Sequence, residues 1–317
     1  MTRINSEGRK NNNGLFLTDG GLETSMIFHE GFDLPEFAAF TLLNSTEGRQ
    51  ALDRYYDSYI SAAVDHNFGF VIDTPTWRAS KKWGKRLGFD AQELVEINKS
   101  AVEFCRAVKE RHADKGIALQ INGAIGPEDD GYNPQSFMTV DQAQAYHSDQ
   151  IRTFSEAGTD SVAAVTMTYV EEAIGVTRAG HALDMPTVIS FTVETDGRLP
   201  SGQALRDAIE QVDRETNSGP VHFMINCAHP DHFDSTLVQG GKWLERVGAV
   251  RANASRMSHA ELDEAEELDE GNPLEFAASY RELMGLLPNL RIMGGCCGTD
   301  HRHVHEIGKT CGSVHRS

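Results

Sequence analysis

Short apolar runs alternate with longer amphipathic segments along the whole chain, and this alternation is typical of βα units around a parallel sheet. The runs predict eight strands, over residues 15–18, 70–73, 117–122, 161–166, 187–191, 222–226, 249–253 and 290–293. Eight units in 317 residues favour an α/β fold of the (β/α)8 TIM-barrel type over a doubly wound sheet. The dinucleotide-binding pattern G-x-G-x-x-G is absent after the first strand, which also disfavours the doubly wound fold.

No repeat or low-complexity linker divides the chain, so we expect residues 1–317 to form a single domain. Residues 1–14 are polar and predict a flexible leader, without the apolar segment of a secretory signal. No apolar run is long enough to span a membrane, so no membrane partner is expected. No helix shows an excess of apolar surface, which leaves the oligomeric state open.

The charge balance disfavours nucleic acid as a partner, because 29 basic residues stand against 47 acidic ones and the net charge is −18. The acidic run at 261–270 predicts a solvated helix or loop, or alternatively the border of a site for a cationic substrate. The five cysteines, without an export signal, indicate a reducing, cytoplasmic location. Thiols or metal ligands are therefore expected, rather than disulfides.

Three cysteines follow two of the predicted strands directly. Cys227 follows 222–226, and Cys296 and Cys297 follow 290–293. The carboxyl ends of barrel strands build the active site, so these side chains can converge on one point. Three thiolates supply three of the four tetrahedral positions of a catalytic zinc ion, Zn2+, and leave the fourth open for a substrate thiol.

Other interpretations of the cysteines stay open at this point. Cys227 could be a small buried hydrophobe, and Cys296 and Cys297 could form a disulfide between neighbours. Cys105 lies on the apolar stripe of a helix and is expected in the core, whereas Cys311 is expected to be incidental. Three glycines surround the Cys296–Cys297 pair: Gly294, Gly295 and Gly298. We expect them to let the backbone turn so that both sulfurs face the metal.

Two sequence motifs end the strands that carry the cysteines: Gly-Gly-Cys-Cys-Gly-Thr at 294–299, and Asn226 before Cys227. Both resemble motifs of the homocysteine S-methyltransferase family, which includes betaine- and S-methylmethionine-dependent enzymes. Thr-Asp-Gly-Gly-Leu-Glu at 18–23 adds to the resemblance. Further matches are Gly126, Pro127, Tyr146, His147 and Asn253.

The resemblance implies a zinc-dependent methyltransferase with Cys227, Cys296 and Cys297 as ligands, homocysteine as the thiol acceptor and methionine as the product. It implies that Asp19 and Gly20 hold the amino-acid part of homocysteine, and that Asn226 and Asn253 belong to the substrate site. A chain of this length implies a small onium donor, S-methylmethionine or S-adenosylmethionine, with betaine as a further option. Trp77 is the aromatic residue expected to form a wall of the donor site, or alternatively a packing tryptophan under a loop.

The chain departs from the family pattern at two strand ends. Val165 stands where family members commonly place a glutamate that binds the substrate amine, and Thr-Pro-Thr-Trp-Arg at 74–78 replaces a common run. Glu194 is a candidate substitute for the missing carboxylate. Glu171 and Glu172 are expected to be solvated in the following helix.

Two other functions are consistent with these residues. One is a zinc- or thiol-binding sensor without turnover, or a barrel that acts on a different thiol. The other is a hydrolase or lyase that uses zinc-bound water, with His229 as the candidate base. Histidines at 301, 303 and 305 cannot all face one ion, and we expect them to be solvated or to face a donor phosphate.

Overall fold

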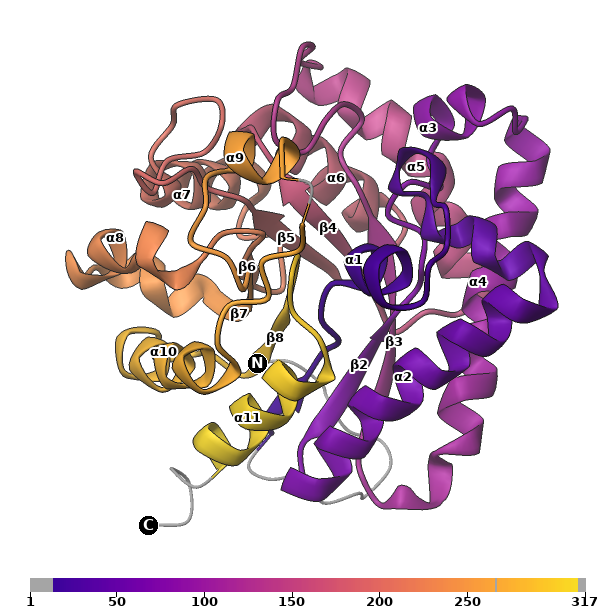
Figure 1. Ribbon diagram of the computed structural model, residues 1–317. Coiled ribbons are helices and arrows are strands. Elements are labelled where there is room, and N and C mark those ends of the chain that lie inside the picture. Colours follow the sequence, from indigo (N-terminus) through magenta and orange to yellow (C-terminus); the bar gives the residue numbers. More distant parts are fainter. Residues whose placement is uncertain (1–13, 266, 313–317) are drawn as a thin grey trace.

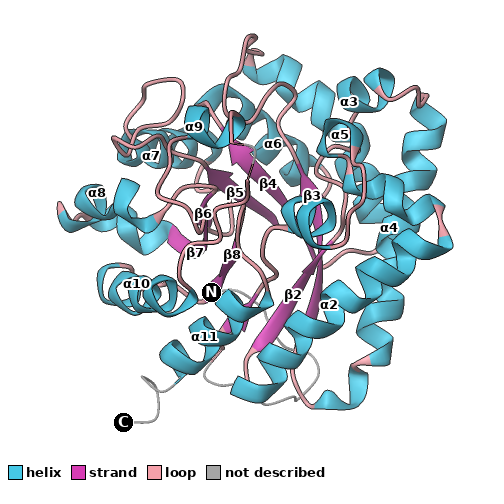
Figure 2. Ribbon diagram, in the orientation of Figure 1, coloured by secondary structure: helices cyan, strands magenta, loops and turns pink. Residues whose placement is uncertain are grey.

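The strands of a computed structural model, which describes residues 14–265 and 267–312, form a closed barrel in which every strand is parallel to its neighbours (Figures 1 and 2). β1 pairs with β2 and, on its other side, with β8, and this pairing closes the ring. The (β/α)8 prediction is confirmed. Apart from Gly14, the predicted leader lies outside the described residues, and the single-domain assignment stays a prediction.

Each observed strand overlaps its predicted run, and the differences are shifts of a few residues at the ends. The strands are β1 Phe16–Leu17, β2 Gly69–Asp73, β3 Leu119–Ile125, β4 Ser161–Met167, β5 Thr187–Phe191, β6 Phe223–Asn226, β7 Val247–Ala252 and β8 Ile292–Gly295. The main helices surround the barrel (Figure 1). The helices are α1 Leu22–Thr24, α2 Thr46–His66, α3 Lys81–Arg86, α4 Ala91–Arg111, α5 Val140–Ala157, α6 Val170–Ala182, α7 Leu205–Thr216, α8 Asp234–Val238, α9 His259–Asp263, α10 Pro273–Leu286 and α11 His301–Gly312.

Local signals in the sequence explain where several helices begin. Thr139 and Gln142 form a capping box at the start of α5, with Gln142 N donating to Thr139 Oγ1 over 3.3 Å. Pro273, which cannot donate a backbone N–H, is the first residue of α10. Asp300 caps α11 by accepting the backbone N–H of Arg302 at 2.9 Å.

The alternation of side chains along the strands separates an outer core from the barrel interior. Outward-facing residues such as Phe70 and Val250 belong to the main apolar core between sheet and helices. A small apolar cluster fills the interior, made of Ala163, Val188, Met224 and Ala249 with Val165 and Ile292 packed against it. Nearer the carboxyl ends of the strands, the side chains that point into the barrel are polar. They are Asp73, Asn122, Ser190, Asn226 and Arg251. The barrel therefore has an apolar floor and a polar upper layer.

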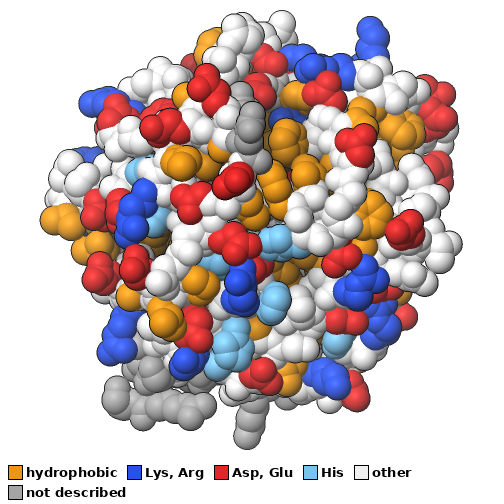
Figure 3. Space-filling model, in the orientation of Figure 1, with side chains coloured by type: hydrophobic (Ala, Val, Ile, Leu, Met, Phe, Trp, Pro, Cys, Tyr) orange, Lys and Arg blue, Asp and Glu red, His pale blue; other side chains and the backbone are white. Residues whose placement is uncertain are grey.

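No helix in the described part of the chain is long and apolar enough to cross a membrane. Acidic side chains are widely distributed over the face shown in Figure 3, and hydrophobic side chains gather near its middle, in the area between α9 and α1. Within the acidic run, Glu261, Glu264 and Glu267 are exposed, as expected. Its end is anchored instead, because Glu270 pairs with His29 at 2.8 Å and Asp269 accepts from Ser255 Oγ at 2.6 Å.

Candidate metal centre

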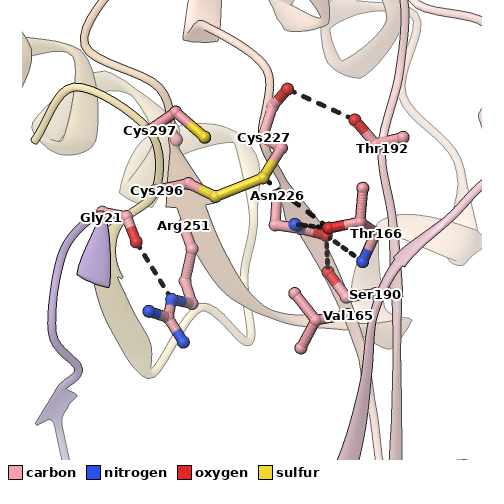
Figure 4. Close-up of a disulfide and its surroundings, with 12 residues drawn as sticks. Gly21, Val165, Thr166, Ser190, Thr192, Asn226, Cys227, Arg251, Cys296 and Cys297 are labelled. Atoms are coloured by element: carbon pink, nitrogen blue, oxygen red, sulfur yellow. Dashed lines mark hydrogen bonds between the residues drawn. A yellow bond between two sulfur atoms is a disulfide. The ribbon is translucent and has the colours of Figure 1, made fainter. Parts of the chain in front are cut away.

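The three cysteines of the predicted site meet at the carboxyl end of the barrel (Figure 4). Cys227 directly follows β6, and Cys296 and Cys297 directly follow β8. Their three sulfur atoms lie within 4.8 Å of one another. Cys227 is buried, whereas Cys296 and Cys297 are partly exposed. The predicted convergence is therefore present, and three soft sulfur donors at such separations fit a zinc ion with one coordination position left for a substrate.

A disulfide joins Cys227 to Cys296, with 5.4 Å between their Cα atoms, and Cys297 is a free thiol. This differs from the expectation that the cysteines are free, and also from the alternative of a bond between Cys296 and Cys297. The Cα separation lies in the usual range for a bridge, and the sequence could not give that distance. Because metal ligands must be thiolates, this pair has to be reduced before all three sulfurs can coordinate an ion.

The backbone near the ends of β4 and β6, the two strands on either side of β5, adopts a left-handed conformation that side chains with a Cβ rarely accept. Cys227 has φ of 52° and Thr166 has φ of 66°. Thr166 lies in β4 where the register with β5 shifts, and its Oγ1 is 3.7 Å from Cys227 Sγ. Irregular backbone of this kind re-aims side chains and is concentrated at functional sites. It gives Cys227 and Thr166 a common orientation toward the site.

Asn226 secures this arrangement with its side-chain amide. Its Oδ1 accepts from Thr166 N at 3.0 Å and from Ser190 Oγ, and its Nδ2 donates to Thr166 Oγ1 at 2.8 Å (Figure 4). The side chain is fully buried. In this arrangement Asn226 links the ends of β4, β5 and β6, and its expected contact with substrate stays a prediction.

The loop after β8 (residues 296–300, the β8 loop) packs tightly against the segment after β1. Gly21 N donates to Thr299 O over 3.0 Å, and a Cβ on Gly21 would lie 2.7 Å from Cys296 O. A Cβ on Gly294 would lie 1.9 Å from Thr18 Oγ1. Of the three glycines around the cysteine pair, Gly298 alone has a positive φ, of 76°. Close packing therefore explains Gly294 better than the expected freedom to turn.

Below the cysteines, Arg251 of β7 forms a buried ion-pair network that sequence reasoning missed. Its guanidinium pairs with Asp19 and with Asp73. Tyr55 OH donates to Asp19 Oδ2 at 3.0 Å. Burial raises the pKa of Asp19 to about 6, and Arg251 opposes this rise. Arg251 lies two residues after Ala249 on the same strand, so both side chains point into the barrel. A charged residue at an inward-facing position of an apolar run was the sequence signal that could have revealed this network.

Both oxygens of Asp19 are thus occupied by protein groups. Gly20 is similarly engaged, because its carbonyl oxygen accepts from Tyr55 OH at 3.1 Å and from Arg251 Nη2 at 3.3 Å. A Cβ on Gly20 would lie 2.6 Å from Tyr59 OH, so only glycine fits there. These contacts place the Asp19–Gly20 segment at the edge of the cysteine cluster with its own polar groups already bonded.

Tyr132, from the connection between β3 and α5, and His259, the first residue of α9, contact the cysteines, and neither was foreseen. Tyr132 OH lies 3.3 Å from Cys297 Sγ, and its ring stacks on His259 with centroids 4.2 Å apart. His259 Nε2 is 2.6 Å from Cys227 O and its Nδ1 is 3.1 Å from Glu194 Oε1. Glu194, the expected substitute for the missing glutamate, is therefore paired with a protein side chain. Only the three-dimensional fold brings these loops together.

Trp77 lies across the end of β4. Its Nε1 donates to Val165 O at 3.2 Å, and the Arg78 guanidinium stacks 3.9 Å from its ring centroid. Val165 itself packs partly against the apolar floor and brings no charge to the site. Asn253 is buried, and its Oδ1 has no hydrogen-bond partner in the described part of the chain.

Several side chains lie elsewhere than expected. Glu171 is exposed, but the expectation of a solvated Glu172 is wrong, because its Oε1 is buried and accepts from Glu128 N at 2.7 Å beside His147 at 2.9 Å. Two carboxylates of a helix N-terminus thus face opposite ways. His303 is also buried, with its Nε2 2.8 Å from Glu270 O, whereas the histidine at 301 is exposed.

His229, the candidate base of a hydrolase, uses its Nδ1 to accept from Asp231 N at 3.2 Å. Burial lowers the pKa of His229 to about 4. Burial also raises the pKa of the Cys297 thiol, and a hydrogen bond from Tyr132 opposes this rise. A free thiol at this position is therefore poorly ionised, which a bound metal cation would reverse.

Comparison with known proteins agrees with this geometry. Residues 16–311 match the family model for homocysteine S-methyltransferase. Homocysteine S-methyltransferase 1 of Arabidopsis thaliana and that of Brassica oleracea var. italica are each 21% identical over 319 residues, covering 93% of this chain and 93% of the relative.

Solved structures share the fold. The homocysteine methyltransferase MmuM from Escherichia coli in its oxidized form superposes with a TM-score of 0.72 at 18% identity, covering 93% of this chain and 96% of that chain. Its metallated form gives a TM-score of 0.71 at 17% identity, and the superposition covers 93% of this chain and 95% of that chain. The family model spans nearly the whole described barrel, including all three clustered cysteines. The chain therefore belongs to the homocysteine S-methyltransferase family of methyltransferase enzymes.

Proposed function

We propose that this protein is a zinc-dependent S-methyltransferase that moves a methyl group from a small onium donor to homocysteine and yields methionine. The observation that carries the proposal is the convergence of three cysteine sulfurs within 4.8 Å at the mouth of the barrel. Cys227, Cys296 and Cys297 would hold the ion in their reduced form. Their chemistry and the five-cysteine content fit a reducing compartment, and we propose the cytoplasm.

When bound, zinc would lower the pKa of the acceptor thiol and so favour the nucleophilic thiolate at neutral pH. The surrounding residues fix where the ligand sulfurs point. Asn226 and Thr166 hold the end of β6 against β4, and His259 and Thr192 bond to the Cys227 carbonyl at 2.6 and 3.3 Å. These contacts orient Cys227 before any ligand binds. Less conformational entropy of this residue is therefore lost when the ligand binds.

The acceptor is proposed to lie between the cysteines and the Asp19–Gly20 segment. Asn253 is proposed to contact it, because its buried Oδ1 lacks a protein partner in the described residues. Glu194 is proposed to border the same space, although its Oε1 is bound to His259. In the reaction the acceptor sulfur forms a bond to the methyl carbon while the donor sulfur–methyl bond breaks. The bonding electrons remain on the donor sulfur, and the thiol proton is released.

The donor is proposed to be a sulfonium, S-methylmethionine or S-adenosylmethionine. Trp77 and Tyr132 are the aromatic rings proposed to attract its positive charge. Trp77 already carries the Arg78 guanidinium on its ring, whereas Tyr132 reaches within 3.3 Å of Cys297. We therefore expect Tyr132 to contribute more to donor binding than Trp77.

The test is a methyl-transfer assay on reduced, zinc-loaded protein with homocysteine. S-methylmethionine, S-adenosylmethionine and betaine are supplied in parallel with deuterated methyl groups, and labelled methionine is measured by mass spectrometry. Labelled methionine is expected from a sulfonium donor, and Cys296→Ser is expected to abolish it while Cys311→Ser, a buried free thiol outside the cluster, does not. Zinc-loaded protein that makes no labelled methionine from any donor would contradict the proposal.

A further inference from the structure

Three carboxylates around the cysteine cluster are already bonded to protein side chains. Arg251 pairs with Asp19 and Asp73, and His259 Nδ1 lies 3.1 Å from Glu194 Oε1. A carboxylate that is already neutralised by a fixed cation has little left to offer a charged substrate. An acceptor with a free ammonium group therefore needs another partner.

Glu23 lies in α1, which is held against the β8 loop by the residues on both sides of it. Gly21 N donates to Thr299 O at 3.0 Å, and Thr24 Oγ1 accepts from Gly298 N at 3.4 Å. Figure 4 shows Gly21 beside Cys296. The loop that carries two of the cysteines thus flanks Glu23.

Glu23 is half-buried and lies between Gly21 and Thr24, the two residues that bond to the β8 loop. The charges of Asp19, Arg251 and Arg78 act on its carboxylate. Glu23 therefore lies beside the loop that carries Cys296 and Cys297, and within electrostatic reach of the ion-pair network below it.

Within the described part of the chain, no protein cation pairs with Glu23. Arg251 is engaged by Asp19 and Asp73, and Arg78 stacks between Trp77 and another tryptophan ring, at 3.9 and 3.6 Å. Burial raises the pKa of Glu23 to about 7. A partly buried carboxylate without a counterion is costly in the free protein, and a bound cation would remove that cost.

We propose that the Glu23 carboxylate binds the α-ammonium group of the thiol acceptor. The inference rests on the proposed function, because it takes the acceptor to be an amino-acid thiol. Homocysteine carries its ammonium group only three carbons from its sulfur, so a partner for that group has to lie beside the cysteines. Val165 cannot supply this charge from the end of β4, and Glu23 supplies it from α1, the short helix that follows β1. Glu23 thus selects acceptors that carry an amine.

The test compares two acceptors by titration calorimetry on reduced, zinc-loaded protein. One is homocysteine and the other is 4-mercaptobutanoate, which has the same thiol and carboxylate but no amino group. Glu23→Gln is expected to weaken homocysteine binding about 10- to 100-fold, the range for losing a hydrogen bond to a charged group. Binding of 4-mercaptobutanoate is expected to be unchanged.

Glu30→Gln is the matched control, because Glu30 is exposed nearby and pairs with Arg54 at 2.6 Å. It should bind both acceptors as the unaltered protein does, and Glu23→Asp should recover part of the loss. Equal losses for both acceptors in Glu23→Gln, or no loss for either, would overturn the role of Glu23. Failure of the unaltered protein to bind homocysteine would instead overturn the proposed function on which the role rests.

Discussion

Arg251 determines the charge balance of the barrel interior. It is buried on β7 and is bonded to two carboxylates, those of Asp19 and Asp73, and its Nε donates to Gly295 O at 3.1 Å. One guanidinium thus ties together the ends of β1, β2, β7 and β8. Since β8 continues directly into Cys296, the same residue supports the position of the cysteine cluster.

Replacing Arg251 with methionine should leave two buried carboxylates without their cation. The free energy of unfolding is expected to fall by about 3–5 kcal/mol, the usual cost of removing one partner from a buried ion pair. Adding Asp19→Asn and Asp73→Asn to this variant should restore part of the loss. Urea denaturation of the variants measures these differences.

Arg178→Met is the control for this comparison, because Arg178 is an exposed arginine that pairs with Asp141 at 3.7 Å. Its effect is expected to stay within about 0.5 kcal/mol, as for most surface substitutions. A loss in Arg251→Met no larger than that in the control would contradict the role given to Arg251.

At the scale of elements, the connection between β3 and α5 (residues 126–139, the β3–α5 loop) brings Tyr132 to the cysteines. Asp129 organises this loop. Its Oδ2 accepts from Gln135 N at 2.8 Å and Ser136 N at 2.9 Å, and its Oδ1 accepts from Lys82 Nζ at 3.0 Å. Asp130 contributes as well, because its Oδ1 accepts from Tyr132 N at 2.8 Å.

Asp129→Asn should loosen the β3–α5 loop and lower the free energy of unfolding by about 1–3 kcal/mol at neutral pH, as expected when hydrogen bonds to a charged group are lost. Burial raises the pKa of Asp129, but the hydrogen bonds from Lys82 and the loop outweigh burial and lower it from 3.8 to about 2. The stabilisation is therefore complete above 3.8 and is lost as the pH falls through about 2.

Denaturation of both proteins across this pH range checks the prediction. The difference between unaltered protein and Asp129→Asn should be constant near neutral pH and should shrink in acid. Asp149→Asn, at an exposed position on α5, is the control and should show no such trend. A difference that grows as the pH falls would contradict the assignment.

For the whole molecule, the sequence was sufficient to predict the barrel and the meeting of the three cysteines at its carboxyl end. Strand positions follow from the spacing of apolar runs, and the carboxyl ends of parallel strands have to meet, which brings Cys227 to the cysteines of β8. The contacts between distant loops could not be predicted. Arg251 and Asp19 are separated by 232 residues, and Tyr132 and Cys297 by 165, so their pairing depends on barrel closure and loop shape.

The sequence also could not predict the disulfide between Cys227 and Cys296, or which way individual side chains point. Glu171 and Glu172 are neighbours with the same charge, and only packing of α6 against α5 decides that Glu172 is buried beside His147. Asn226 matched a family position, but its amide bonds to protein groups. The residue types were predictable, whereas their partners were not.

Zinc stoichiometry of the reduced protein tests the central claim most directly. Protein purified with a reductant and dialysed against buffered zinc should retain one equivalent per chain, measured by atomic absorption. Cys227→Ser, Cys296→Ser and Cys297→Ser should each lose that equivalent, and Cys311→Ser should keep it. Reduced protein that retains no zinc, or that retains it equally in the three cluster variants, would contradict the metal centre on which the account depends.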